Sequence, residues 1–192
     1  MKYAGFLLHL KKFIELDEEE ENILIAAFHY QEIRKKEHVL QEGQVCTSYY
    51  FILKGCFRSY FINENANEQV VQFGIENWWI TDYDSLLSQR PSFFSIQAIE
   101  ASEVVRIDKK VMDELFLKIP RLERYFRIVL QRTYAASQMR IRYLYGMTAE
   151  ERYEHFHSLF PEFVQRVPLY MLASYLGFSP EFLSRIRARK NV

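Results

Sequence analysis

The chain has 192 residues, 49% of them hydrophobic, which is enough to bury one large core or two small ones and argues against disorder. Its 25 basic and 25 acidic residues give a formal net charge of zero. No apolar stretch approaches the roughly 20 residues that a membrane-spanning helix needs, and residues 6–8 are not followed by a small-residue cleavage site, so we expect a cytoplasmic protein.

The residues that most enzymes and metalloproteins use for chemistry form no recognisable pattern. Cys46 and Cys56 are too few for a disulfide framework or a four-thiolate iron–sulfur cluster, and both are expected to be ordinary reduced cysteines. His155 and His157 lie two positions apart on a predicted helix, so they point to different faces. Phosphate-binding glycine loops, nucleophile elbows and zinc motifs are missing from the sequence. We therefore expect no enzyme, no cofactor and no metal.

The two signs of charge are unevenly distributed along the chain. Residues 1–120 carry 13 basic and 19 acidic residues, a net charge of −6, whereas residues 121–192 carry 12 and 6, a net charge of +6. Eleven of these twelve basic residues are arginine, whose planar guanidinium matches phosphate and guanine edges better than an ammonium does. The imbalance favours nucleic-acid binding by the C-terminal part. An ordinary solvated charged face is the alternative.

The first 120 residues predict helices followed by a β-rich domain. Residues 6–30 carry apolar side chains at helical spacing, and the acidic run 18–21 is placed as at a helix start, which predicts two helices. From Val39 to Ile107 short β-rich runs alternate with turn residues, which predicts a sandwich or jelly roll. The expected strands are Tyr49–Leu53, Phe57–Ile62, Gln69–Phe73, Ile96–Ile99 and Glu103–Ile107.

After Pro120 a single long helix is predicted to reach Tyr145 and to end at Gly146. It carries two apolar stripes, and a helix of this kind can face its own domain on one side and a partner helix on the other. The stripe that we expect at a homodimer interface consists of Phe126, Val129, Thr133, Ala136, Arg140 and Tyr143. The other stripe consists of Leu130, Tyr134, Ser137, Ile141 and Leu144. A helix packed within one subunit is the alternative.

Further helices are predicted in the C-terminal part. Residues 148–151 form a capping box that opens a helix reaching Leu159, and Pro161 starts another short one. The expected domains are the β-rich domain over residues 1–120, the long helix over residues 121–146 and a helical domain over residues 147–192.

Residues 168–190 have the pattern of a helix-turn-helix. Ala173 supplies the small residue that two closely crossing helices need, and Gly177 supplies the positive φ of a tight turn. The remaining inward positions are Leu172, Leu176, Phe178, Leu183 and Ile186. An ordinary helical hairpin is the alternative interpretation.

The second helix of this motif has the features of a helix that enters the major groove. Ser179 is its predicted N-cap, Pro180 is its first helical residue, and Glu181 lies beside the positive end of its dipole. The N-terminal residues of such a helix meet base edges, and flanking cations meet phosphates. The predicted DNA-contacting residues are Ser179, Glu181, Ser184, Arg185, Arg187, Arg189 and Lys190.

With these motifs the chain resembles the Crp/Fnr family of bacterial regulators. The resemblance covers nearly the whole chain and is strongest in LASYLGFSPEFLSRI (172–186), with LQEGQ, YFILKGCFRSYF and SEVVRIDKK resembling barrel strands of the family. It implies an α+β fold with a cyclic-nucleotide-binding-like jelly roll, a long dimerisation helix and a C-terminal helix-turn-helix domain. It also implies double-stranded DNA and a second copy of the chain as partners, with Glu181 and Arg185 reading bases.

The sequence departs from the family pattern in two places. Asp82 stands near the Glu of the phosphate cassette found in cyclic-nucleotide-binding members, and residues 92–94 (Ser-Phe-Phe) stand where those members carry an arginine followed by a small hydroxyl residue or alanine. We therefore expect no response to cyclic AMP, although Arg90 could substitute as an anion partner. The candidate pocket for an unidentified small-molecule effector consists of Asp82, Ser85, Arg90, Phe93 and Phe94. Val192 follows the reading helix closely, so the wing is expected to be missing.

The favoured function is a homodimeric, sequence-specific DNA-binding transcription regulator. One alternative is a non-catalytic sensory or interaction protein with a vestigial helix-turn-helix. A jelly-roll enzyme is a third possibility, but it would need inward-facing clusters of histidine and carboxylate, which these strands lack.

Overall fold

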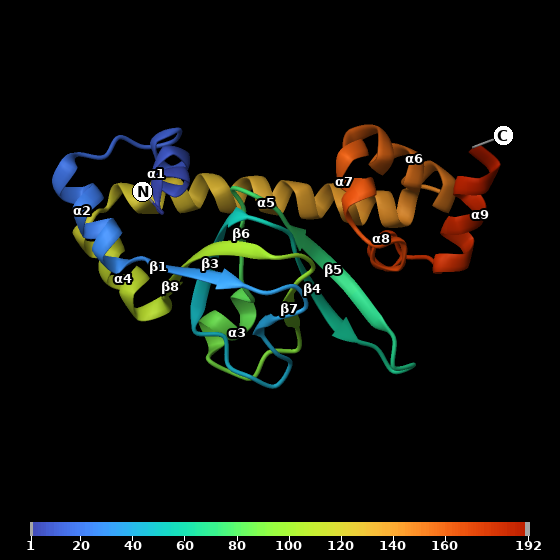
Figure 1. Cartoon of the computed structure of the whole chain (residues 1–192), viewed down its shortest axis with the longest axis horizontal. Helices are drawn as coiled ribbons and strands as arrows, with labels where there is room; N and C mark the ends of the chain where they lie inside the picture. The colour runs from blue at the N-terminus through green and yellow to red at the C-terminus, as the bar shows by residue number, and fades with distance from the viewer. Residues whose placement is uncertain (1, 191–192) are drawn as a thin grey trace. The chain divides into compact units, whose positions relative to one another are not determined.

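The computed structural model describes residues 2–190, except for the side chain of Lys190. The chain divides into two compact units. Unit 1 comprises Met1–Phe61 and Phe73–Leu130, and unit 2 comprises Ile62–Gln72 and Gln131–Val192. Figure 1 labels the helices and strands in chain order. The division differs from the domains expected from the sequence, because a short segment inside the β-rich region belongs to unit 2 and the long helix is shared between the units.

Unit 1 begins with helices α1 (Ala4–Lys11) and α2 (Glu18–Ala27). A capping box starts α2, in which Asp17 accepts a hydrogen bond from the Glu20 amide and Glu20 accepts one from the Asp17 amide. The two predicted helices are therefore present. The helical segment predicted over residues 6–30 ends too late, because Tyr30 lies in strand β1 and pairs there with Val105.

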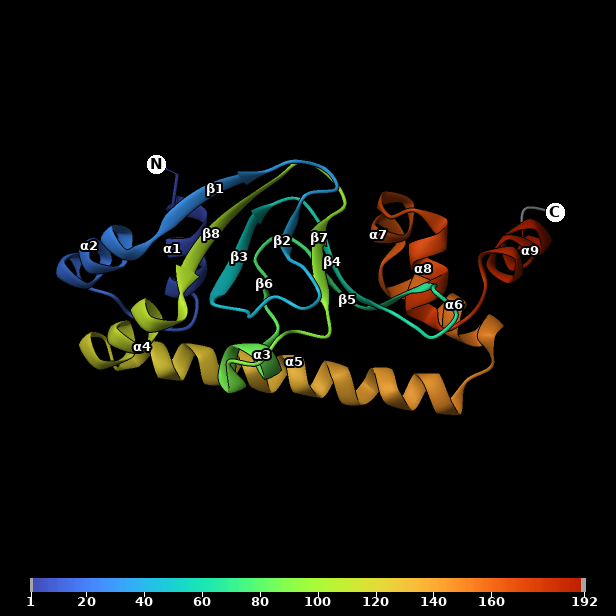
Figure 2. The ribbon, with the colours of Figure 1, turned by 90° about the horizontal axis from the view of Figure 1, so that it is seen from below.

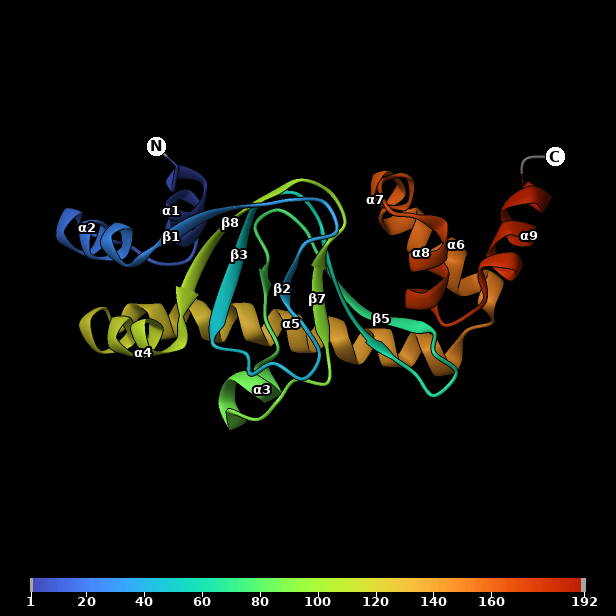
Figure 3. The ribbon, with the colours of Figure 1, turned by 60° about the horizontal axis from the view of Figure 1, so that its bottom comes forward.

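Two four-stranded sheets form the β-rich part, with strand orders β1-β8-β3-β6 and β2-β7-β4-β5. Figure 3 shows β1, β8 and β3 of the first sheet side by side. The strands are β1 (His29–Ile33), β2 (His38–Leu40), β3 (Ser48–Lys54), β4 (Phe57–Ile62), β5 (Glu68–Gly74), β6 (Trp79–Ile80), β7 (Ser95–Ala98) and β8 (Ser102–Asp108). The five predicted strands are present with their ends shifted by at most one residue. The other three strands were not predicted: Tyr30 of β1 falls within the helical pattern of residues 6–30, and β2 and β6 have only three and two residues.

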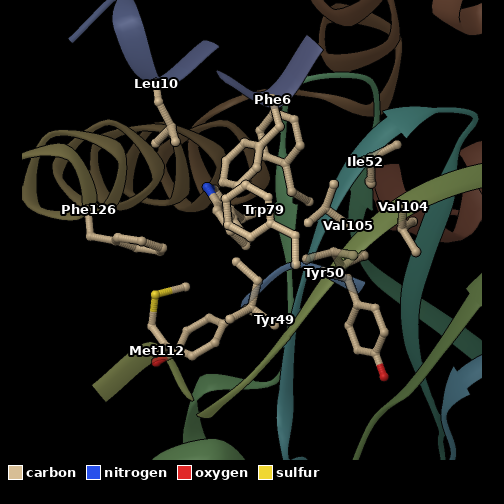
Figure 4. Packing of buried hydrophobic residues seen from close by; sticks show 14 of the residues in the cluster. Phe6, Leu10, Tyr49, Tyr50, Ile52, Trp79, Val104, Val105, Met112 and Phe126 are labelled. Atoms are coloured by element: carbon tan, nitrogen blue, oxygen red, sulfur yellow. The ribbon is translucent and has the colours of Figure 1, made fainter. Parts of the chain in front are cut away.

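The core of unit 1 is a cluster of aromatic side chains between the first sheet and the helices (Figure 4). Trp79 lies at its centre, with ring centroids 5.3 Å from Phe6, 5.3 Å from Phe51 and 5.0 Å from Phe126. The Trp79 indole N–H donates a 2.8 Å hydrogen bond to the hydroxyl of Tyr125. Burial raises the pKa of Tyr125, so this phenol stays protonated and hydrogen-bonded inside the cluster.

Three helices complete unit 1 and lead out of it. Helices α3 (Tyr83–Ser88) and α4 (Lys109–Lys118) were not predicted from the sequence. Helix α5 (Arg121–Gly146) follows its predicted bounds closely. The first ten residues of α5 belong to unit 1 and the others to unit 2. Unit 2 then adds α6 (Ala149–Leu159), α7 (Pro161–Arg166), α8 (Leu169–Leu176) and α9 (Pro180–Lys190). The predicted capping box at Thr148 and Glu151 starts α6.

The first turns of α5 contradict part of the predicted dimer interface. Phe126 is only 6% exposed, and its ring contacts Trp79 and Phe116 within unit 1. Val129 also packs against the core of unit 1. Helical periodicity places both residues on the buried face of α5, so they stabilise the subunit itself and are not available to a partner.

Phe126→Ala should therefore lower the free energy of unfolding by about 3–5 kcal/mol, because it leaves a cavity in the aromatic cluster. Thr133→Ala, at an exposed position of the same helix, should change it by less than about 0.5 kcal/mol. Denaturant unfolding followed by tryptophan fluorescence measures this, since both tryptophans, Trp78 and Trp79, lie in unit 1. Equal midpoints for the two variants would contradict the assignment of Phe126 to the core.

Candidate functional site

The turn between α8 and α9 has the geometry of a helix-turn-helix. Gly177 ends α8 with φ of +82°, and its amide together with that of Phe178 donates back to the carbonyls of Ser174 and Ala173. A Cβ at Gly177 would lie 3.1 Å from the Arg152 guanidinium. Glycine is therefore favoured here both by the backbone conformation and by the close side chain.

The predicted inward residues of this motif lie between α8 and α9 or beside them. Leu172, Ala173 and Leu183 are fully buried, and Leu176 and Ile186 are nearly so. Phe178 is half-buried, with its ring centroid 5.8 Å from that of Phe182. The small residue at the helix crossing and the apolar residues around it thus form one local core.

The C-terminal end of α8 receives side chains from three other elements of unit 2. The Gln69 amide, on β5, donates to the carbonyl of Ser174. Arg140, on α5, donates to the carbonyl of Tyr175 at 3.1 Å, and Arg152, on α6, donates to the carbonyl of Leu176. The last carbonyls of a helix have no partner within the helix, so these donors stabilise the helix end that precedes the turn.

Arg152 also connects this helix end to the end of α5. Its guanidinium donates to the carbonyls of Leu144 at 3.1 Å and Met147 at 3.2 Å. One cation therefore satisfies carbonyls at two helix C-termini, where the helix dipole favours positive charge. Arg152 could not be identified from the sequence. Its acceptors lie outside its own helix and are main-chain carbonyls, which every residue type carries.

Arg140 has a different role from the one predicted at the dimer interface. Its guanidinium lies 4.3 Å from the ring centroid of Tyr175, and burial lowers its pKa, although an arginine remains charged at neutral pH. Tyr143, from the same predicted stripe, is half-buried with its ring 4.5 Å from that of His155. Both side chains pack inside unit 2. Of that stripe, Thr133 and Ala136 are exposed.

Helix α9 presents the predicted DNA-contacting residues on its surface. Glu181, Ser184, Arg185, Arg187 and Arg189 are all exposed, and the side chain of Lys190 lies outside the description. The Ser179 hydroxyl accepts a 3.2 Å hydrogen bond from the Phe182 amide, which makes Ser179 the N-cap, as its residue type predicts.

Glu181 and Arg185 both interact with neighbouring residues. Hydrogen bonds from the Glu181 backbone amide and from Ser179, together with the charge of Arg185, lower the pKa of Glu181, so its carboxylate is an acceptor at neutral pH. The Arg185 guanidinium lies 5.6 Å from the ring centroid of Phe182. A charged acceptor and a charged donor thus stand one helical turn apart on an exposed face.

Two of the residues predicted to form an effector pocket in the barrel, Asp82 and Ser85, make hydrogen bonds within unit 1. The Asp82 carboxylate caps α3 by accepting from the amides of Asp84 and Ser85, and it accepts a 2.6 Å hydrogen bond from Ser92. The Ser85 hydroxyl accepts from the Cys46 amide and donates to the carbonyl of Arg90. These groups hold the α3 loop together, and their hydrogen-bonding capacity is used within it.

The other predicted pocket residues lie at the surface or against a neighbouring strand. The side chain of Phe93 is 73% exposed, and Arg90 is exposed as well. Phe94 packs with its ring centroid 6.2 Å from that of Phe61. We find no group of His, Cys, Asp and Glu side chains placed to bind a metal within residues 2–190. The helices of that same part of the chain include none long and apolar enough to cross a bilayer.

Residues 30–118 match the family model of the cyclic nucleotide-binding domain. The chain is 30% identical over 169 residues to the "Anaerobic regulatory protein" of Aggregatibacter actinomycetemcomitans, an alignment that covers 82% of this chain and 65% of the relative. It is also 30% identical over 169 residues to the "Fumarate and nitrate reduction regulatory protein" of Vibrio cholerae, covering 82% of this chain and 66% of the relative. The chain thus spans slightly less than two thirds of the length of these relatives.

The fold resembles that of a solved regulator at low sequence identity. The c-di-GMP responsive global regulator CLP of Xanthomonas campestris has a TM-score of 0.75 and 14% identity, covering 91% of this chain and 92% of that chain. The matched domain, the regulatory relatives and the shared fold agree with the motifs at 172–186. In sequence and in fold the chain is similar to regulators of the Crp/Fnr family.

Proposed function

We propose that this chain is a sequence-specific DNA-binding transcription regulator that reads base pairs with α9. The observation that carries the proposal is the exposed face of α9, where Glu181, Ser184 and Arg185 follow a glycine turn and an N-cap. A helix that exposes such a face fits the major groove of B-DNA. The regulatory names of the relatives support the same function.

We further propose that the regulator is a homodimer through α5, with the second apolar stripe at its interface. Residues 131–139 are all exposed in the single chain, and Leu130, Tyr134 and Ile141 are 40%, 66% and 55% exposed. These three positions, with Ser137, repeat at alternating spacings of four and three, which is the period of a two-helix seam. An exposed apolar row of this length favours a partner helix.

The β-rich part of unit 1 would serve this regulator as a sensor or scaffold. Its effector, if it binds one, is a small molecule of unidentified chemistry. The Asp82 carboxylate is engaged with Ser92 and with the N-terminus of α3, so it is not placed to support an anionic ligand. This arrangement favours a barrel that has lost classical nucleotide binding.

Selection of genomic DNA fragments by the purified protein tests the proposed function directly. Arg185→Ala should relax the base preference at one position of each half-site, because Arg185 can donate two hydrogen bonds to guanine, worth about 1–3 kcal/mol of discrimination. Arg187→Ala and Arg189→Ala should weaken all sequences alike and lower the salt slope by about one unit each. An affinity that does not change with salt concentration would refute these roles. An Arg185→Ala variant that loses affinity equally for every operator variant would also refute them.

The dimer is tested by sedimentation of a charged variant. Leu130→Glu combined with Ile141→Glu should give monomers and weaken operator binding, because it places carboxylates in an apolar seam. Ala135→Glu, at an exposed position off that stripe, is the matched control and should leave the dimer intact. A variant that sediments like the wild type would exclude this interface.

Cyclic AMP should not bind measurably to the wild-type protein in calorimetry. The Asp82 carboxylate would repel its phosphate, and Ser92, Phe93 and Phe94 stand where the family carries the arginine that neutralises this phosphate. Asp82→Asn removes the repulsion and keeps one side-chain oxygen for the cap of α3, so it separates the two causes. Saturable heat at micromolar cyclic AMP with the wild type would show that the site is functional.

A further inference from the structure

The tip of the hairpin formed by β4 and β5 contacts α8 inside unit 2 (Figure 2). Strand β5 is the edge strand of its sheet, so one side of its backbone has no strand neighbour. The side chain of Ser174, on α8, takes the place of a strand neighbour at two residues of β5. Its hydroxyl accepts a 2.9 Å hydrogen bond from the amide of Val70 and donates a 2.8 Å hydrogen bond to the carbonyl of Glu68. One helical hydroxyl thus pairs with a donor and an acceptor of the exposed strand edge.

A second connection runs in the opposite direction. The side chain of Gln69, which lies between those two strand residues, donates to the main-chain carbonyl of Ser174. Each element therefore binds backbone groups of the other, and the Ser174 carbonyl also accepts from the Gly177 amide. Ser174 lies three residues before Gly177, so the contact reaches the helix end that carries the turn.

The hairpin is covalently continuous with unit 1. The chain leaves unit 1 after Phe61, passes through the hairpin tip and re-enters unit 1 at Phe73. Beyond β4, strand β7 pairs with residues 57–60 in the same sheet. The hairpin tip is therefore joined to unit 1 by the main chain and to α8 by the hydrogen bonds at Ser174.

The contact leaves the proposed reading face free. Glu181, Ser184 and Arg185 are exposed while the contact is made, because it involves α8 and not α9. An element that holds the first helix without covering the second limits the orientations of the second helix. Binding then requires less ordering of the protein.

We propose that Ser174 and Gln69 form a latch through which the β4–β5 hairpin positions the helix-turn-helix for DNA. The effect on DNA rests on the function proposed above, whereas the latch itself is a property of the free protein. Both residues are positioning residues, since they act through the orientation of α8.

Hydrogen exchange in the free, full-length protein tests the latch without DNA. Ser174→Ala should raise the exchange rate of the Val70 amide about tenfold, because that amide loses its acceptor. Gln69→Ala, whose parent side chain is half-buried at the strand edge, should raise it less and should not unfold the protein. The matched controls are Gln72→Ala, whose side chain points to the other face of the same strand, and Ser158→Ala, whose hydroxyl bonds only within α6. Neither control should change the exchange rate.

Affinity for a duplex selected by the wild-type protein is the second measurement. Ser174→Ala and Gln69→Ala should each weaken binding by roughly three- to tenfold, with the sequence preference unchanged, because the reading residues are intact. An unaltered Val70 exchange rate in Ser174→Ala would overturn the latch. Faster exchange with tighter DNA binding would overturn its positioning role and indicate an inhibitory contact. If the wild type selects no duplex, the proposed function fails, and the exchange rates still decide the latch.

Discussion

The C-terminal end of α8 is the constraint on which the proposed DNA-reading geometry depends. A helix end leaves several carbonyls without donors, and a buried carbonyl without a partner costs about 1–3 kcal/mol. Here Gln69, Arg140 and Arg152 supply those donors from β5, α5 and α6. Because the glycine turn follows directly, the same contacts determine where α9 begins and which of its faces is exposed.

The arginines of the C-terminal part divide into two groups that composition cannot separate. Arg140 and Arg152 are at least partly buried and bind main-chain carbonyls, so their charge supports helix ends. Arg185, Arg187 and Arg189 are exposed on α9 and available to DNA. The net charge of +6 over residues 121–192 therefore overstates the charge that can face a phosphate backbone.

The same division between internal and external roles applies to the β-rich part. Its aromatic residues form a packed cluster around Trp79, and Asp82 and Ser85 stabilise the α3 loop. Asp82 and Ser85, which the sequence places among the candidate ligand contacts, make hydrogen bonds with other groups of the protein. A polar residue type at a given position shows that hydrogen bonds are needed there, but not whether the protein or a ligand provides them.

Local patterns in the sequence were sufficient for the helix-turn-helix, the long helix, the capping box at Thr148 and five strands, because each depends on residues within one or two turns or one strand. The α3 and α4 helices, the shared hairpin and the roles of Phe126, Arg140 and Arg152 were decided only by tertiary structure. The stripe that contains Phe126 and Arg140 has the right period for an interface, but periodicity identifies a buried face without naming what covers it. Gln69 and Ser174 are 105 residues apart, and the Gln69 side chain binds a main-chain carbonyl, which every residue carries, so no sequence pattern could have paired them.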